Sequence, residues 1–134
     1  MILLDLSVIF TRSGEDLLTL YEALPEVLRA WQQQSIPIVG LSPSAEFTTA
    51  WRALWPQAVI QDSANWASWR LPSAWQALCT AHGMRPTDCV LYTRHPAWLN
   101  AATQASITAY GILRDAHTMA ALPGTWFAEL PNAP

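Results

Sequence analysis

The sequence predicts an α/β domain in which a mostly parallel, five-stranded sheet lies between two layers of helices. Short apolar runs rich in branched residues alternate with segments of helical periodicity along most of the 134 residues. Runs that are apolar throughout indicate strands buried on both faces, as in a parallel sheet. The length suits one domain of roughly 100–200 residues. We therefore expect a single domain over residues 1–134, with a core at 1–112 and a C-terminal tail at 113–134.

Five segments have the length and composition of buried strands. The first is an apolar run interrupted only by Asp5 and Ser7. The second has Pro37 near its start, where a strand tolerates a missing N–H, and it is followed by Ser42. The other three are shorter runs in which branched and aromatic residues recur. The predicted strands are residues 1–10, 36–41, 58–61, 89–92 and 107–112.

The helices are predicted from the residues at their ends. Proline fits the first turn of a helix and opens three of them, at Pro25, Pro72 and Pro96. Ser44 is a good N-cap for the fourth, and Gly83 suits a C-terminal cap. The predicted helices are residues 24–34, 44–55, 72–82 and 96–106. The remaining segments are expected to form a turn at 11–14, a short helix or irregular flap at 15–21, a loop at 62–71 and a weak helix from 115.

The composition excludes several classes of function. The net charge is −3 and only 13% of residues are charged, so no electrostatic attraction to nucleic acid or an anionic membrane is expected. All seven basic residues are arginines, which excludes a Schiff-base or phosphate-binding lysine. The apolar runs are shorter than a membrane span, and residues 1–10 lack the basic residues of a secretory signal. We therefore expect a cytoplasmic protein in which Cys79 and Cys89 are small buried groups rather than a disulfide.

Polar side chains gather where the predicted strands end. In open α/β sheets the ligand site lies at the carboxyl ends of the strands. Arg94 and His95 come just before a helix that begins with proline, and a helix N-terminus adds positive charge. We therefore interpret Ser42, Arg94 and His95 as candidate anion ligands. A structural ion pair between Arg94 and Asp5 is the alternative interpretation.

Four segments of the sequence resemble the haloacid dehalogenase (HAD) superfamily of hydrolases. Together they cover roughly residues 1–112, and their order and spacing agree with the family. The resemblance implies a three-layer, Rossmann-like fold, here without a large cap domain because only a short segment separates Ile9 from Leu24. The segments are Leu3-Leu-Asp5-Leu-Ser7, the helix and strand at 24–42, the helix and strand at 72–92, and Tyr92-Thr-Arg-His-Pro-Ala-Trp-Leu-Asn-Ala-Ala102 with the strand at 107–112.

The catalytic motifs of that family are only partly matched. The family uses a first aspartate as the nucleophile and a second, two residues later, as the general acid/base. Asp5 stands at the nucleophile position, but Ser7 replaces the acid. Ser42 matches the motif residue that donates to phosphate, whereas the motif lysine is missing and Arg70 is the nearest cation. Arg94 and Trp98 stand where acidic magnesium ligands are expected.

These departures predict a degenerate active site. Mg²⁺ takes oxygen ligands, usually including carboxylates, so Asp5 facing Arg94 is expected to hold no metal and to pair with the guanidinium instead. We interpret the protein as a catalytically inactive, HAD-like module without a cofactor that binds a protein or a small anion. The alternative is an active hydrolase with Asp5 as nucleophile, either a phosphatase or a metal-independent enzyme assisted by Ser42, Arg70 and Arg94. A PIN-type nuclease would need more acidic residues than the strand ends provide.

Eight tryptophans are unusual for a chain of this size. Trp51 and Trp55 are four residues apart and share one face of a predicted helix. Tryptophan is enriched at interfaces, and low surface charge favours association. The sequence therefore predicts a tryptophan-rich surface for a protein partner or a homodimer, formed by Trp51, Trp55, Trp66 and Trp69. Packing of these side chains in the core is the alternative.

Overall fold

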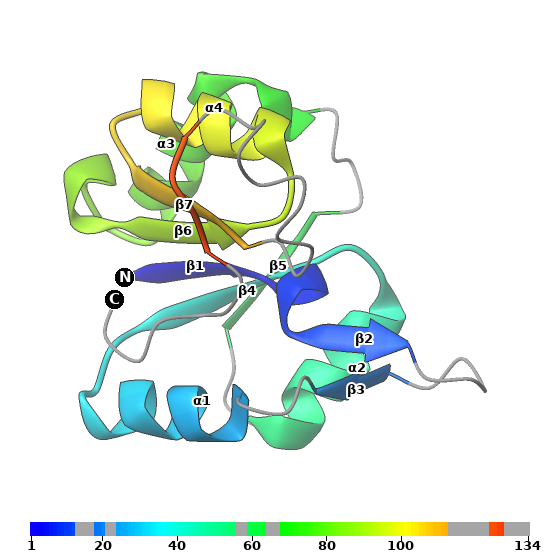
Figure 1. The fold of residues 1–134 in the computed structure, drawn as a ribbon. Helices are drawn as coiled ribbons and strands as arrows, with labels where there is room; N and C mark the ends of the chain where they lie inside the picture. The colour runs from blue at the N-terminus through cyan, green and yellow to red at the C-terminus, as the bar shows by residue number, and fades with distance from the viewer. Residues whose placement is uncertain (13–17, 21–23, 56–58, 64–67, 113–123, 128–134) are drawn as a thin grey trace.

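A six-stranded parallel sheet forms the centre of the protein in a computed structural model (Figure 1). The structure describes residues 1–12, 18–20, 24–55, 59–63, 68–112 and 124–127. The strand order is β5-β4-β1-β6-β7-β8, and every pairing between neighbours is parallel. The strands are β1 (Ile2–Asp5), β4 (Ile38–Ser42), β5 (Val59–Asp62), β6 (Val90–Thr93), β7 (Thr108–Ile112) and β8 (Trp126–Phe127).

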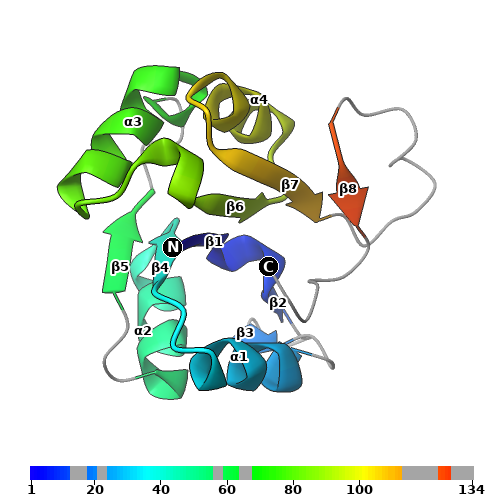
Figure 2. The same ribbon diagram turned by 90° about the vertical axis from the view of Figure 1, so that its left-hand side faces the viewer.

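In the described part of the chain, four α-helices cover the two faces of this sheet. Helices α1 (Leu24–Gln33) and α2 (Ala45–Leu54) lie on one face, and α3 (Pro72–Ala81) and α4 (Pro96–Gln104) lie on the other (Figures 1 and 2). Strand residues contribute alternately to two hydrophobic cores, because successive side chains point to opposite faces. Leu4 packs with Trp31 of α1 and Trp51 of α2, whereas Leu3 packs with Trp75 and Trp98. The predicted three-layer α/β/α fold is confirmed, with a helix at each of the four predicted positions and a strand overlapping each of the five predicted strand segments.

The N-terminal apolar run is not one strand as predicted. Strand β1 ends at Asp5, and a 3₁₀ turn follows at Leu6–Val8. The Asp5 carboxylate caps this turn by accepting a hydrogen bond from the Ser7 backbone N–H. The chain then continues into a two-stranded antiparallel hairpin of β2 (Phe10–Arg12) and β3 (Leu18–Leu20). The turn expected at 11–14 and the flap expected at 15–21 therefore lie, where described, in a hairpin.

Other short elements were not predicted either. The loop expected at 62–71 contains a 3₁₀ turn at Ser68–Arg70. Strand β8 adds a sixth strand beside β7, where the Gly111 N–H donates to the Thr125 carbonyl over 2.8 Å. A Cβ on Gly111 would collide with the Trp126 ring, so glycine is what allows β8 to approach. The weak helix expected from 115 lies outside the described residues.

Most described tryptophans belong to the cores. Trp31, Trp51, Trp75 and Trp98 are all at most 2% exposed. Trp69 is also buried and packs against Trp75, with ring centroids 4.8 Å apart. The predicted tryptophan-rich surface is therefore wrong for Trp51 and Trp69, because the two cores have room for these rings.

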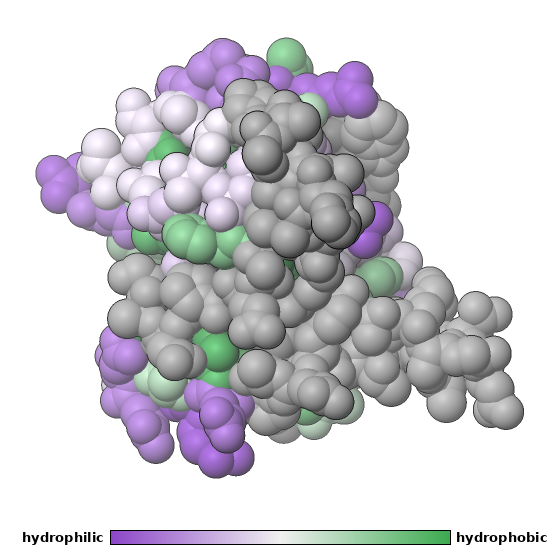
Figure 3. Space-filling model, in the orientation of Figure 1, coloured by the Kyte–Doolittle hydropathy of each residue, from purple (hydrophilic) through white to green (hydrophobic). Residues whose placement is uncertain are grey.

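The other two positions of that surface have different outcomes. Trp55 is half-buried against Trp51, with ring centroids 5.5 Å apart, and Trp66 lies outside the described residues. On the face shown in Figure 3, the described hydrophobic residues form small separate patches. Among the described helices, none has the length and apolar character needed to cross a membrane. A protein partner or homodimer remains a prediction.

Candidate functional site

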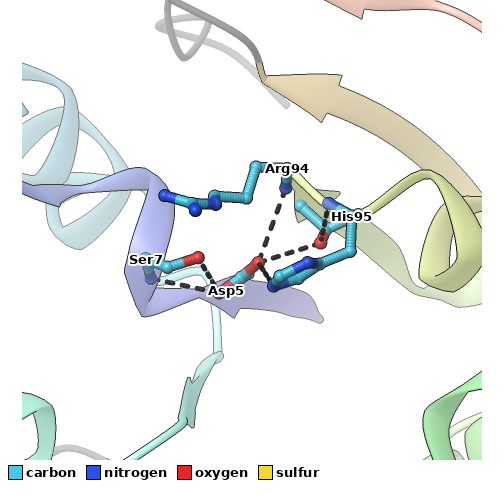
Figure 4. Close-up of polar contacts among 5 residues, drawn as sticks. Asp5, Ser7, Arg94 and His95 are labelled. Atoms are coloured by element: carbon cyan, nitrogen blue, oxygen red, sulfur yellow. Dashed lines mark hydrogen bonds and ion pairs between the residues drawn. The ribbon is translucent and has the colours of Figure 1, made fainter. Parts of the chain in front are cut away.

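The candidate site lies where strands β1 and β6 end. These strands are neighbours in the sheet, so their carboxyl ends bring Asp5 and Thr93 together. The turn from β6 into α4 supplies Arg94 and His95, and the 3₁₀ turn after β1 supplies Ser7. Figure 4 shows these side chains around the Asp5 carboxylate. This is the edge of the sheet at which sequence reasoning placed a ligand site.

The Asp5 carboxylate is buried and surrounded by hydrogen-bond donors. Oδ1 accepts from the Ser7 backbone N–H at 3.0 Å and from the Ser7 hydroxyl at 2.7 Å. Oδ2 accepts from the Thr93 hydroxyl at 2.9 Å and, at 3.5 Å, from the Arg94 backbone N–H. His95 Nε2 lies 3.5 Å from the same oxygen. With Asp5 only 1% exposed, these protein groups replace the water that a free carboxylate would bind.

His95 is the ionisable partner of Asp5. Its ring packs on Trp98 with centroids 4.4 Å apart, and its backbone N–H donates to the Thr93 hydroxyl over 3.1 Å. Burial lowers the pKa of His95 below its usual 6.5, and the nearby Arg94 charge lowers it further, while Asp5 acts in the opposite direction. The imidazole is therefore mostly neutral at pH 7, and it can still donate an N–H to Asp5.

The predicted ion pair between Arg94 and Asp5 is wrong. Arg94 reaches the carboxylate only through its backbone N–H, and His95 takes the place predicted for the guanidinium. The Arg94 side chain is exposed and extends past the carboxylate towards the Ser7 turn (Figure 4). No side-chain ion pair of Arg94 occurs within the described ranges. In the tight turn between β6 and α4, the side chain of His95 points to the Asp5 carboxylate, whereas that of the preceding Arg94 extends past it.

Ser42 does not join this cluster. Asp5 is in register with Leu41, which packs in the core beneath α3 and α4. Ser42 follows Leu41 and therefore points to the opposite face, towards α2. Its hydroxyl lies 2.7 Å from both the Ser44 carbonyl and the Thr48 hydroxyl. Ser42 instead lines a cavity of about 430 Å³ beside α2, together with the side chains of Arg52 and Asp62.

Arg70 is also separate from the cluster. It ends the 3₁₀ turn Ser68–Arg70 and is exposed, and none of the polar contacts of Asp5 within the described residues involves it. The set of Asp5, Ser42, Arg70 and Arg94 expected of a metal-independent hydrolase is therefore not assembled. Thr93 is the site residue that sequence reasoning did not assign. Its position at the end of the strand neighbouring Asp5 is the signal that could have found it.

The donor set around Asp5 does not fit a magnesium ion. Mg²⁺ needs oxygen ligands in near-octahedral geometry, usually including one or two carboxylates. Among the described residues, Asp5 is the only carboxylate at this site, and its neighbours there are N–H and O–H donors plus an arginine. In the described part of the chain, no three His, Cys, Asp or Glu side chains are grouped as metal ligands would be. The described residues of this site therefore do not form a magnesium site.

Solved structures share the fold of this chain. A HAD family hydrolase from Deinococcus radiodurans, with bound phosphate and sodium, is 21% identical with a TM-score of 0.61; the match covers 84% of this chain and 56% of that one. A protein from Streptomyces avermitilis described as a candidate HAD family hydrolase is 13% identical with a TM-score of 0.56, covering 83% and 65%. An uncharacterised protein from Corynebacterium glutamicum is 17% identical with a TM-score of 0.55, covering 81% and 80%.

These likenesses define a HAD-like α/β fold. The chain spans less than two thirds of the length of both hydrolase structures. No family model matches the sequence, and no curated protein is significantly similar to it. The fold class implied by the sequence resemblance is therefore confirmed, and what the site does is a separate question.

Proposed function

We propose that this HAD-like domain does not transfer phosphoryl groups and instead binds a small anion at the end of strands β1 and β6. The observation that carries the proposal is the crowding of the Asp5 carboxylate. A carboxylate has about four lone-pair sites, and three hydrogen bonds of 2.7–3.0 Å occupy three of those of Asp5. The Arg94 backbone N–H and His95 Nε2 both lie 3.5 Å from Oδ2, so an attack by Asp5 on a phosphoryl group would have to displace one of these neighbours.

The same arrangement favours an anion beside Asp5 rather than a metal upon it. The Arg94 guanidinium is exposed and has no partner among the described side chains, so it is available to a ligand. The His95 side chain does not cap helix α4, so the N–H groups of Ala97 and Trp98, which follow Pro96, have no cap from that side chain. Arginine and a helix N-terminus both recognise oxyanions, and together they give Arg94 and His95 the roles expected from the sequence.

A small anion is favoured over a protein partner by the burial of the tryptophans. The protein-binding alternative depended on a tryptophan-rich surface, and Trp51 and Trp69 lie inside the cores. The anion-binding alternative depends on Arg94, which the structure leaves exposed. A cytoplasmic location belongs to the same proposal.

Two measurements test the proposal. Phosphate binding, followed by calorimetry, is expected in the millimolar range and weakened roughly tenfold or more by Arg94→Gln. Arg29→Gln is the matched control, because Arg29 is an exposed arginine of α1 on the other side of the sheet. Equal loss of binding in the two variants would mean that phosphate binds through net charge and not at this site.

The competing function is hydrolysis with Asp5 as nucleophile, which the shared fold with hydrolases favours. It is tested with an activated phosphate ester and Mg²⁺. The proposal predicts the same turnover for the wild type and Asp5→Asn. Magnesium-dependent turnover that disappears in Asp5→Asn would establish an active phosphatase and refute the proposal.

A further inference from the structure

Two buried thiols face each other on the other side of the sheet from α1 and α2. Cys79 of α3 and Cys89, directly before β6, are ten residues apart, and their sulfur atoms are separated by 3.5 Å. Both cysteines are free and at most 1% exposed. A disulfide bond is about 2.05 Å long, so the two sulfurs would have to approach each other by about 1.5 Å to form one.

The two thiols differ in how close they lie to solvent. Cys89 follows an exposed 3₁₀ turn at Pro86–Asp88, and its thiol contacts the Arg85 carbonyl at 3.4 Å. Opening of this single turn would therefore uncover Cys89. Cys79 lies within α3, where burial, together with the neighbouring thiol, raises its pKa to about 12. Thiolates are the reactive form, so Cys79 is the poorer first target for an oxidant.

We propose that Cys79 and Cys89 form a reversible disulfide when the protein meets a peroxide, with Cys89 oxidised first and Cys79 resolving it. The Cys89 sulfur attacks the peroxide, so an S–O bond forms, the O–O bond breaks, and the leaving hydroxide takes the thiol proton as water. The Cys79 sulfur then attacks the Cys89 sulfenic acid, so the S–S bond forms and the S–O bond breaks. The second hydroxide leaves with the Cys79 proton as water. Two thiols and one hydrogen peroxide thus give one disulfide and two waters.

The distance between the sulfurs decides the outcome of the first oxidation. A sulfenic acid persists or oxidises further when no thiol is near, and it condenses when one is held beside it. Cys79 is already in contact with Cys89, so condensation is favoured over further oxidation. The resulting bond joins α3 to the start of β6. We expect the oxidised protein to melt roughly 5 °C or more above the reduced protein, because the bond restricts the unfolded chain.

The experiment treats the folded, full-length chain with hydrogen peroxide, then denatures it, alkylates free thiols and digests it with trypsin. Residues 71–94 form one tryptic peptide with both cysteines, because the bond between Arg85 and Pro86 resists trypsin. In the oxidised protein we expect this peptide to carry no alkyl group on either cysteine and to be lighter than the unmodified reduced peptide by the mass of two hydrogen atoms. Treatment with dithiothreitol before alkylation should restore two alkylated cysteines. Wild-type peptide that keeps two alkylated cysteines, links to a second molecule or carries sulfinic acid would overturn the proposal.

Single variants test the order of the two steps. In Cys79→Ala, Cys89 has no resolving thiol, so we expect a sulfenic acid that the probe dimedone captures. In Cys89→Ala, Cys79 should stay reduced. If dimedone labelled Cys79 in Cys89→Ala but did not label Cys89 in Cys79→Ala, Cys79 would be the residue oxidised first and the assigned order would be wrong. The wild-type measurement tests the disulfide itself even if a variant fails to fold.

Discussion

Replacement of Asp5 by alanine is expected to destabilise the fold strongly, although the residue stands where a hydrolase would have its nucleophile. The carboxylate caps the turn after β1 and joins that turn to the end of β6. Alanine keeps the strand position but removes every one of these hydrogen bonds. The fold should persist, since both cores are untouched, but with a smaller free energy of unfolding.

The magnitude follows from the individual contacts. Loss of a capping side chain costs about 1 kcal/mol. A hydrogen bond to a charged group contributes about 1.5–3 kcal/mol, and the Thr93 hydroxyl, which is fully buried, would lose its acceptor. The contacts of Asp5 with the Arg94 N–H and with His95, both at 3.5 Å, add nothing to this sum of free energies. The expected loss is about 3 kcal/mol, which lowers the melting temperature by about 10 °C for a domain of this size.

The assay is urea denaturation followed by tryptophan fluorescence, with thermal denaturation as a second readout. Asp88→Ala is the matched control, because Asp88 is also an aspartate in an ion pair, with Arg85 at 3.0 Å, but its side chain is 44% exposed. An exposed pair of this kind contributes at most about 1 kcal/mol. Asp5→Asn should fall between the two, since it keeps one carbonyl oxygen. If Asp5→Ala were no less stable than Asp88→Ala, the carboxylate would not hold this end of the sheet together.

Three further predictions concern His95, Trp75 and Gly111. The pKa of His95 is lower in the folded protein than the usual 6.5 of the unfolded chain, so its contribution to the free energy of unfolding is complete above pH 6.5 and is lost as the pH falls through the lowered value. In His95→Gln, the free energy of unfolding should therefore change less between pH 7.5 and 5 than in the wild type. Trp75→Phe loses a buried hydrogen bond of 2.7 Å to the Trp69 carbonyl, so urea denaturation should show a free energy of unfolding lower by about 2 kcal/mol. The control Trp55→Phe changes a half-buried side chain and should lower it by under about 1 kcal/mol. Gly111→Ala should displace β8 at a cost of about 1–3 kcal/mol. The amide at position 111 should then exchange faster than in the wild type, and unchanged exchange would contradict the close approach of Trp126.

The central strands β1, β4 and β6 were predictable because they are largely buried on both faces. Such strands are apolar throughout, so runs like residues 38–42 stand out from the sequence. Strand β8 has only two residues and carries no comparable pattern; its place depends on the contact between Gly111 and Trp126. The 3₁₀ turn after β1 was hidden in an apolar run because one side chain, Asp5, ends the strand by capping.

The location of the site was predictable, but its geometry was not. The carboxyl ends of parallel strands share one edge of the sheet, which is why Asp5 and the residues after β6 meet. Whether Arg94 or His95 turns towards Asp5 depends on the backbone between β6 and α4, which the sequence pattern does not determine. Ser42 was expected beside Asp5, but Asp5 is in register with Leu41. The side chain of the next residue, Ser42, points to the opposite face of the sheet because side chains alternate along a strand.

The most direct test of the account is an experimental crystal structure of the protein grown with Mg²⁺ and vanadate, a mimic of phosphate. We predict an oxyanion bound by the Arg94 guanidinium and the N-terminus of α4, with Asp5 still held by Ser7 and Thr93. A magnesium ion bound to an Asp5 oxygen at about 2.1 Å, with vanadate in line with the carboxylate, would contradict the account and restore this site as a phosphatase centre.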